Sequence, residues 1–207
     1  MTETTQVTDD TIRGPGRPRN FDVDAALDQA IVVFSERGYH AASISELTAA
    51  MGLTPGSIYK AFGDKKGVLL SAFDRYKTVR NRLRDDAVGQ GASGRDKLKR
   101  LLDFYAAASS GPAGIEGCLI VGVTTELAAV DQEAADKVRR SIATNDEFVE
   151  TLIREGQADG SIRTDMDVGA AAAMIVCVQQ GMRVVGKTGR SEEEMVLVVD
   201  VAMRAIG

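Results

Sequence analysis

The feature that most constrains the fold is a series of apolar stripes with helical spacing, separated by capping residues and glycines. In the first stripe, apolar residues recur at i, i+3, i+4, i+7, i+8 and i+11 from Val23 to Phe34. Asp22 is a suitable N-cap for this helix, and Gly38 is a suitable stop. Similar stripes follow along the whole chain. The sequence therefore predicts an all-α fold.

About nine helices are predicted from these stripes and their caps. They begin near residues 23, 43, 55, 64, 98, 117, 132, 167 and 191. The segment 117–130, GCLIVGVTTELAAV, has the β-branched content of a strand. Because no other segment offers a partner strand, we predict a buried helix there. Gly111 to Gly114 is predicted to be a break between helices.

Composition and cysteine count limit the class of protein. No apolar run approaches 18 residues, and the first 20 residues lack the apolar core of a secretory signal. These observations favour a cytoplasmic protein without a membrane partner. The two cysteines, Cys118 and Cys177, are too far apart for a metal-ligand cluster or a disulfide framework. We therefore expect no metal and no cofactor.

The net charge of −5 is divided unevenly along the chain. Residues 1–84 carry +2, whereas residues 85–207 carry −7. Three arginines lie between Arg13 and Arg19 without an acidic residue among them. A locally basic front end on an acidic protein indicates a polyanionic partner for that end, although a chance fluctuation would give the same totals.

Residues 43–62 have the spacing of a helix-turn-helix. Ser43 and Glu46 form a capping box at the start of one helix, which ends at Gly52. Thr54 then caps a short helix that has Pro55 at its first position. The second helix of such a pair places its N-terminal residues against base edges in the major groove. A capped helical hairpin without DNA contacts would show the same pattern.

The residues of this segment suit two kinds of DNA contact. Small residues at the start of the second helix allow close approach to the bases, whereas hydroxyl and ammonium groups suit phosphates. Arg17 and Arg19 lie in an extended arm that either enters an A·T-rich minor groove or adds only non-specific attraction. The predicted DNA-binding residues are Arg17, Arg19, Ser43, Ser45, Thr54, Pro55, Gly56, Ser57, Tyr59, Lys60 and Lys65.

Residues 26–73 resemble the DNA-binding domain of TetR/AcrR-type transcriptional regulators. The matching residues are Ala30, Phe34, Gly38-Tyr39, Ser43, Ile44, Leu47, Ala50, Gly52, Ile58-Tyr59, Phe62, Lys65 and Leu69. Ala61 departs from the pattern, because many members carry His or Tyr there. In the other half, GCL at 117–119 and GMRVVGK at 181–187 resemble one subgroup.

The resemblance implies an all-α homodimer that binds a palindromic operator in double-stranded DNA and releases it when a small molecule binds. The expected parts are a flexible basic arm (1–20), a helix-turn-helix domain (21–66), a connecting helix (67–88) and a ligand-binding and dimerisation domain (89–207). The last two helices, about 167–187 and 191–206, would form the dimer interface. They would otherwise cover the domain's own core.

The resemblance also places a ligand pocket among the middle helices of the C-terminal domain. The many small residues there suit a modest apolar pocket. The lining residues are predicted to be Phe104, Tyr105, Cys118, Val121, Thr125, Phe148 and Met174, each of which would also suit plain core packing. An alternative function is a thiol-based redox or electrophile sensor, in which a helix start activates Cys118. Cys177 is predicted to be core.

An enzyme and an architectural helical protein are the rival classes. The only histidine, His40, lies in the other half of the chain from Cys118, and no HExxH, GxSxG or phosphate-loop motif is present. We therefore expect no catalytic residues. Displacement of DNA by a metabolite would distinguish a regulator from an architectural protein.

Overall fold

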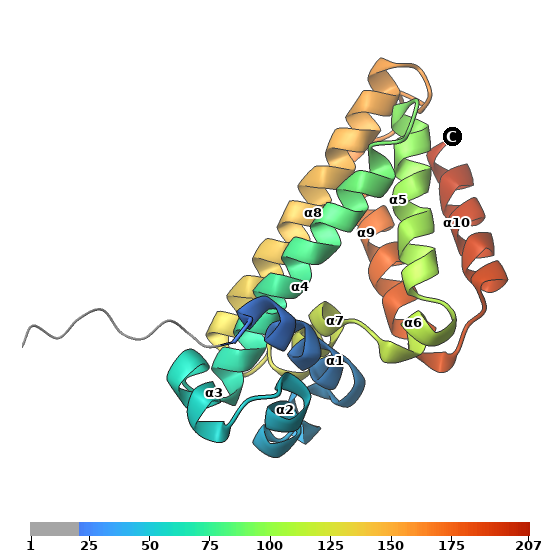
Figure 1. Cartoon of the computed structure of the whole chain (residues 1–207). Coiled ribbons are helices and arrows are strands. Elements are labelled where there is room, and N and C mark those ends of the chain that lie inside the picture. Colours follow the sequence, from blue (N-terminus) through green and yellow to red (C-terminus); the bar gives the residue numbers. More distant parts are fainter. Residues whose placement is uncertain (1–20) are drawn as a thin grey trace, which may run out of the picture.

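The computed structural model describes residues 21–207, and this part of the chain is entirely helical (Figure 1). Its helices are α1 (Val23–Ala41), α2 (Ile44–Met51), α3 (Pro55–Phe62), α4 (Lys65–Val88), α5 (Gly94–Ala108), α6 (Gly111–Glu116), α7 (Leu119–Glu126), α8 (Gln132–Ala158), α9 (Val168–Val185), the 3-10 helix η1 (Gly186–Thr188) and α10 (Glu192–Ile206). The predicted all-α class is confirmed. The basic arm, with Arg17 and Arg19, lies outside the described residues.

Two local predictions have different outcomes. The segment 117–130 does form a helix, α7, because Leu119 and Val123 are buried against neighbouring helices. The predicted break at Gly111 to Gly114 is wrong, since these residues begin the short helix α6. Pro112 sits in its first turn, where a missing backbone N–H costs nothing. This extra helix brings the described residues to ten α-helices.

Two hydrophobic clusters form the core. The first joins α1, α2, α3 and the start of α4, and it also includes Leu119, Val123 and Leu127 with the start of α8. The second joins the end of α4 with α5, the later part of α8, α9 and α10. The first cluster thus contains residues from both sides of the predicted domain boundary.

Helix α4 is the element that belongs to both clusters. The residues of α4 buried in the first cluster lie between Val68 and Phe73, and Val88 is buried in the second. Between them α4 is rich in polar and basic residues, from Asp74 to Asp86. The helix begins beside α3 and runs toward the opposite end of the molecule (Figure 1). It is therefore a continuous connection between the two halves.

Helix α9 with η1 forms a span of 21 residues (Val168–Thr188) that is long and apolar enough to cross a membrane by length and composition alone. The expectation that no segment is so apolar is thus wrong. One side of α9 packs against α8, and it carries the buried polar residues Gln179 and Arg183. The helix therefore serves as a core element of this fold.

The outer face formed by α9 and α10 is apolar but exposed. Its exposed residues are Met174, Val184, Val185, Val196, Leu197, Val198 and Val201. Cys177 is also exposed on α9, so its predicted core position is wrong. Both helices are apolar on more than one side, which is the pattern of a helix that packs on two neighbours.

Candidate functional site

The helix-turn-helix is held by a few buried side chains and by its caps. Gly52 ends α2 in the left-handed conformation, with φ of 64°, and Thr54 caps α3 by accepting a hydrogen bond from the Ser57 backbone N–H. Ile58 of α3 and Leu47 of α2 are both fully buried. Phe62 of α3 is partly buried and packs against the same core, so the opposite side of α3 is left exposed.

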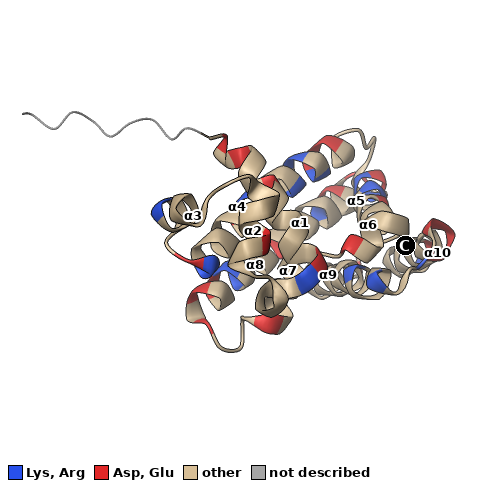
Figure 2. Cartoon of the chain, turned by 60° about the horizontal axis from the view of Figure 1, so that its bottom comes forward, with Lys and Arg blue, Asp and Glu red and all other residues tan. Residues whose placement is uncertain are grey.

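The free surface of α3 is small, polar and basic. Thr54, Pro55, Gly56 and Lys60 are exposed, and the side chain of Tyr59 is 52% exposed. Figure 2 shows basic colour and no acidic colour on α3, which projects from one end of the molecule. Such a surface matches the requirements for a helix that approaches nucleic acid.

Three predicted hydroxyl donors already have partners within the chain. Ser43 Oγ exchanges hydrogen bonds with Glu46, accepting from its backbone N–H at 3.1 Å and donating to its carboxylate at 2.9 Å. The Ser43 backbone N–H also donates to this carboxylate at 2.9 Å, and this hydrogen bond, followed by that of the hydroxyl, lowers the pKa of Glu46. The hydroxyls of Thr54 and Ser57 lie 2.9 Å apart and bond to each other. Ser45 is exposed in the first turn of α2. Their contacts with DNA stay predictions.

Lys65 lies differently from the phosphate contact that the sequence predicted. Its Nζ donates to the carbonyl oxygens of Tyr39 and Ala42, each at 2.9 Å, and lies 4.4 Å from the centre of the Tyr39 ring. Carbonyls at a helix C-terminus have no intrahelical partner, so a lysine there satisfies them. The ammonium therefore joins the end of α1 to the start of α4, and its phosphate contact stays a prediction.

Two further contacts tie the helix-turn-helix half to the C-terminal half. Lys66 Nζ lies 2.7 Å from the Asp131 carboxylate at the start of α8, and this hydrogen bond lowers the pKa of Asp131. The backbone N–H of His40 donates to Glu126 Oε2 of α7 at 3.1 Å. This carboxylate lies against Gly38, which has φ of 79°. A shift of α7 or α8 would therefore reach α1 and α4 directly.

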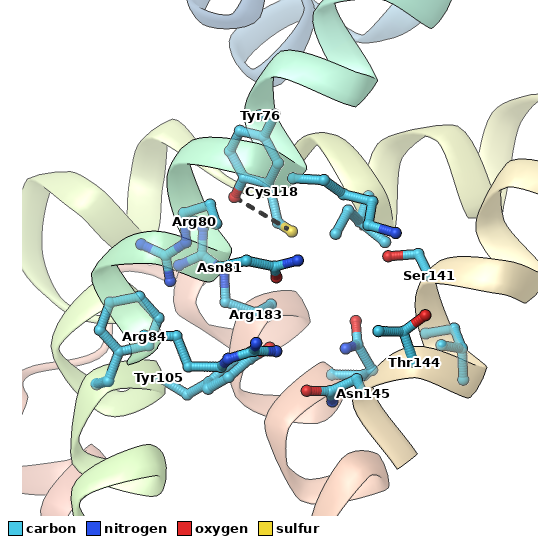
Figure 3. Close-up of a pocket in the computed structure, with 15 residues that line it drawn as sticks. Tyr76, Arg80, Asn81, Arg84, Tyr105, Cys118, Ser141, Thr144, Asn145 and Arg183 are labelled. Atoms are coloured by element: carbon cyan, nitrogen blue, oxygen red, sulfur yellow. Dashed lines mark hydrogen bonds between the residues drawn. The ribbon is translucent and has the colours of Figure 1, made fainter. Parts of the chain in front are cut away.

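A polar cavity lies where the two hydrophobic clusters meet (Figure 3). Side chains of α4 and α8 face each other across it. Its volume is about 40 Å³, enough for a few water molecules. It is lined by Tyr76, Lys77, Arg80, Asn81, Arg84, Phe104, Tyr105, Cys118, Ile120, Ser141, Ile142, Thr144, Asn145, Gln180 and Arg183.

The lining combines apolar surface with several cationic side chains, which the sequence did not predict. Lys77, Arg80, Arg84 and Arg183 contribute positive charge, and no acidic residue of the described chain lines the cavity. Burial raises the pKa of both Tyr76 and Tyr105, so their hydroxyls stay protonated and neutral at pH 7. The cavity therefore has an excess of positive charge.

The predicted ligand-binding residues divide into two groups. Phe104, Tyr105 and Cys118 line the cavity, and the Tyr76 hydroxyl donates to the Cys118 sulfur at 3.6 Å. The cavity lining does not include Val121, Thr125, Phe148 or Met174. Thr125 and Met174 are exposed, and Phe148 packs 3.8 Å beneath the guanidinium of Arg84.

Sequence reasoning missed the basic residues of α4, although a signal for them was present. Tyr76, Arg80 and Arg84 recur at intervals of four, which places them on one helical face. A polar stripe on a helix usually faces solvent, so the spacing alone did not indicate a cavity. Only the packing of α5, α8 and α9 around that face encloses it.

The two short segments GCL (117–119) and GMRVVGK (181–187) meet beside the cavity. The Arg183 guanidinium donates to the Gly117 carbonyl oxygen. Lys187 Nζ donates to the carbonyl of Ser35 in α1 at 3.0 Å, and its stem passes over Gly117. Gly117 has φ of 90°, and a Cβ there would lie 2.1 Å from Lys187 Cε. These segments thus connect α1, α7 and α9.

Comparison with known families agrees with this arrangement. A model of bacterial regulatory proteins of the tetR family matches residues 26–72, which include α2, α3 and most of α1. A model of the tetracyclin repressor-like C-terminal domain matches residues 94–201. The chain belongs to the TetR family. The described all-α architecture is that of TetR-family structures.

Individual TetR relatives span almost the whole chain. The HTH-type transcriptional repressor ComR of Escherichia coli (strain K12) is 27% identical over 195 residues, which cover 91% of this chain and 90% of ComR. The TetR-family repressor DhaR of Mycobacterium sp. (strain GP1) is 28% identical over 87% of this chain and 89% of its own length.

A solved TetR structure extends the likeness to three dimensions. It is a cysteine mutant of the transcriptional regulator CifR in complex with 26-base-pair double-strand operator DNA. Its sequence is 32% identical to this chain, and the match covers 93% of this chain and 100% of the CifR chain. The two structures superpose with a TM-score of 0.82.

Proposed function

We propose that this TetR-family protein is a DNA-binding transcriptional repressor that leaves its operator when a small molecule enters the cationic cavity. The observation that carries the proposal is the position of that cavity. It lies on α4, the helix whose first turn supports the helix-turn-helix and whose last turn belongs to the second core. Anything that changes the cavity therefore acts on the element that joins both halves.

The exposed start of α3 would face the base edges of double-stranded DNA. Thr54, Pro55, Gly56 and Ser57 would lie in the major groove, and Tyr59 and Lys60 would contact phosphates. The exposure of all of these residues except the partly buried Ser57 supports this proposal. Ser43 and Ser45 would contact the backbone from α2. The chain carries no acidic residue between Glu46 and Asp64 to repel a phosphate.

A homodimer follows from the apolar outer face of α9 and α10. Packing this face against a second copy would form a four-helix interface and remove Leu197 and Val201 from water. Two-fold symmetry would then present two α3 helices to successive major grooves about 34 Å apart, which suits a palindromic operator. A DNA partner implies a cytoplasmic protein, and this function requires no catalysis.

Coupling between effector and DNA follows from the size of the cavity. A volume of about 40 Å³ is too small for most metabolites, so a ligand must displace lining side chains. Five of those side chains belong to α4. Displacing them would move α4 relative to α8. The contacts of Lys65 would transmit the shift to the C-terminal end of α1, and those of Lys66 to the start of α8.

Footprinting of DNA upstream of the protein's own gene, at two salt concentrations, tests the proposal. We expect a protected palindrome whose affinity falls steeply as salt rises, because phosphate contacts release counterions. Protection elsewhere in the genome, found by selection, would place the operator at a distance. Absence of salt-sensitive binding to any DNA would refute the assignment of α3.

A thiol sensor at Cys118 is a second candidate function. The favourable observation is that Cys118 Sγ lines the cationic cavity beside Arg183 and the Tyr76 hydroxyl. Its side chain is almost fully buried, which restricts access by oxidants. If the thiol is the sensor, Cys118→Ser would keep DNA binding but lose release by hydrogen peroxide or methylglyoxal. Unchanged release of that variant by these reagents would exclude the candidate.

A further inference from the structure

We propose that the cavity recognises the carboxylate of a small organic acid, with Arg183 as its principal partner. This inference rests on the proposed function, because it names the chemical class of the effector at the same site.

Arg183 is a buried cation with unused hydrogen-bonding capacity. Its residue is 5% exposed, and it donates one hydrogen bond from Nη2 to the Gly117 carbonyl. Its Nε and Nη1 are buried without a hydrogen-bond partner. No group within residues 21–207 accepts from these two nitrogens, so they are available to donate to a bound anion. A carboxylate is the planar acceptor that fits two guanidinium N–H groups at once.

The surroundings of Arg183 strengthen its preference for an anion. Lys77, Arg80 and Arg84 line the same cavity. Of the four cationic residues in the lining, only Arg84 forms an ion pair within residues 21–207, and its partner is Asp85. Arg80 instead lies 4.1 Å above the ring of Phe104. The phenols beside them are neutral, as described above. Among the residues that line this cavity, none is acidic.

A second hollow gives room for the organic part of such a ligand. It has a volume of about 180 Å³ and shares Tyr76, Arg80 and Arg183 with the first cavity as a common wall. Its remaining lining includes the apolar side chains of Ile31, Val32, Ala108 and Ala113 and, at exposed positions, the carboxylates of Glu36 and Glu116. An acid whose carboxylate binds Arg183 would therefore place its apolar tail between α1 and α6, where it would act on the DNA-binding half directly.

The test compares acids with their neutral amides, which have nearly the same shape. Thermal unfolding and isothermal titration calorimetry of the full-length protein use sodium propionate and benzoate, with propionamide and benzamide as matched controls at constant ionic strength. We expect at least one acid to raise the melting temperature and to bind at least about tenfold more tightly than its amide, the gain expected of a charge-assisted bidentate contact. Equal binding of acids and amides, or no binding of either acid, would overturn the proposal.

Arg183→Gln assigns the contact, and Arg82→Gln is its control. Arg82 is exposed on α4 outside the cavity lining, so its substitution removes the same charge. We expect the acid preference to disappear in Arg183→Gln and to persist in Arg82→Gln. Loss of the preference in both variants would indicate a general charge effect and overturn the assignment. If Arg183→Gln does not fold, Arg80→Gln and Arg183→Lys replace it, and an unweakened acid preference in both would contradict the proposal.

DNA binding is measured separately on the same samples. If the protein binds an acid but protects no DNA, the proposed function is refuted, whereas the proposed carboxylate site is still supported. Operator binding by a protein that does not distinguish acids from amides would refute only the carboxylate site.

Discussion

Replacing Lys65 with methionine tests whether this residue joins two helices or binds DNA. The substitution keeps the apolar stem and removes the ammonium that bonds to the carbonyls of Tyr39 and Ala42. It also removes the contact of the ammonium with the Tyr39 ring. Both carbonyl oxygens would then lose their hydrogen-bond donor at the end of α1.

The size of the effect follows from these contacts. Each hydrogen bond to a charged group contributes about 1.5–3 kcal/mol when buried. Lys65 is only half-buried, so the two bonds together should contribute roughly 2–3 kcal/mol after screening by water. For a chain of this size, that loss corresponds to a fall in melting temperature of about 4–12 °C.

Thermal unfolding monitored by circular dichroism without DNA measures this change directly. Lys60→Met is the control, because Lys60 is exposed on α3 and forms no ion pair within residues 21–207. We expect Lys60→Met to melt within about 2 °C of the unmodified protein, as surface substitutions usually do. A Lys65→Met variant that melts normally but binds operator DNA much more weakly would refute the structural role and support a phosphate contact.

Three further predictions concern other contacts. Gly117→Ala should lower the free energy of unfolding by about 1–3 kcal/mol, because the φ of 90° at Gly117 is a conformation that other residues rarely adopt. Gly122 lies in helix α7 with open space around it, so Gly122→Ala should raise the free energy of unfolding by about 0.5–1 kcal/mol. Denaturant titration of the two variants measures both changes. The hydrogen bond from Lys66 lowers the pKa of Asp131 in the folded state. The stabilisation that ionised Asp131 gives the fold is therefore present above its unfolded pKa of about 3.9, and it is lost as the pH falls through the folded pKa. Asp131→Asn should be less stable than the unmodified protein at pH 7 and should lose less stability in acid. Lys60→Gln should weaken binding similarly for all DNA sequences and reduce the salt slope by about one per α3 that contacts DNA, and an unchanged slope would contradict the phosphate contact.

Much of the helical pattern could be predicted from the sequence because its causes are local. The apolar stripe of α1, the capping box at Ser43 and the Thr54-Pro55 start of α3 depend on residues a few positions apart. The exposed surface of α3 follows too, because Ile58 and Phe62, four positions apart, place one side of the helix against the core and leave Tyr59 and Lys60 exposed. The short helix α6 was missed because its Gly-Pro start resembles a break.

The cavity and the role of Lys65 depended on tertiary structure. Lys65 Nζ finds its partners 23 and 26 residues earlier in the chain, so no local pattern distinguishes it from a lysine that binds phosphate. The cavity combines side chains from α4, α5, α8 and α9 with Cys118 and Ile120 at the start of α7. Its basic residues would form a solvated stripe on an isolated α4.

The sequence by itself determined where the helices lie and which short helix presents a free polar surface, because helix formation and capping are governed by neighbouring residues. Only the tertiary structure decided which polar residues became buried. The packing of two hydrophobic clusters at either end of α4 encloses its basic middle and leaves Arg183 without a full set of partners.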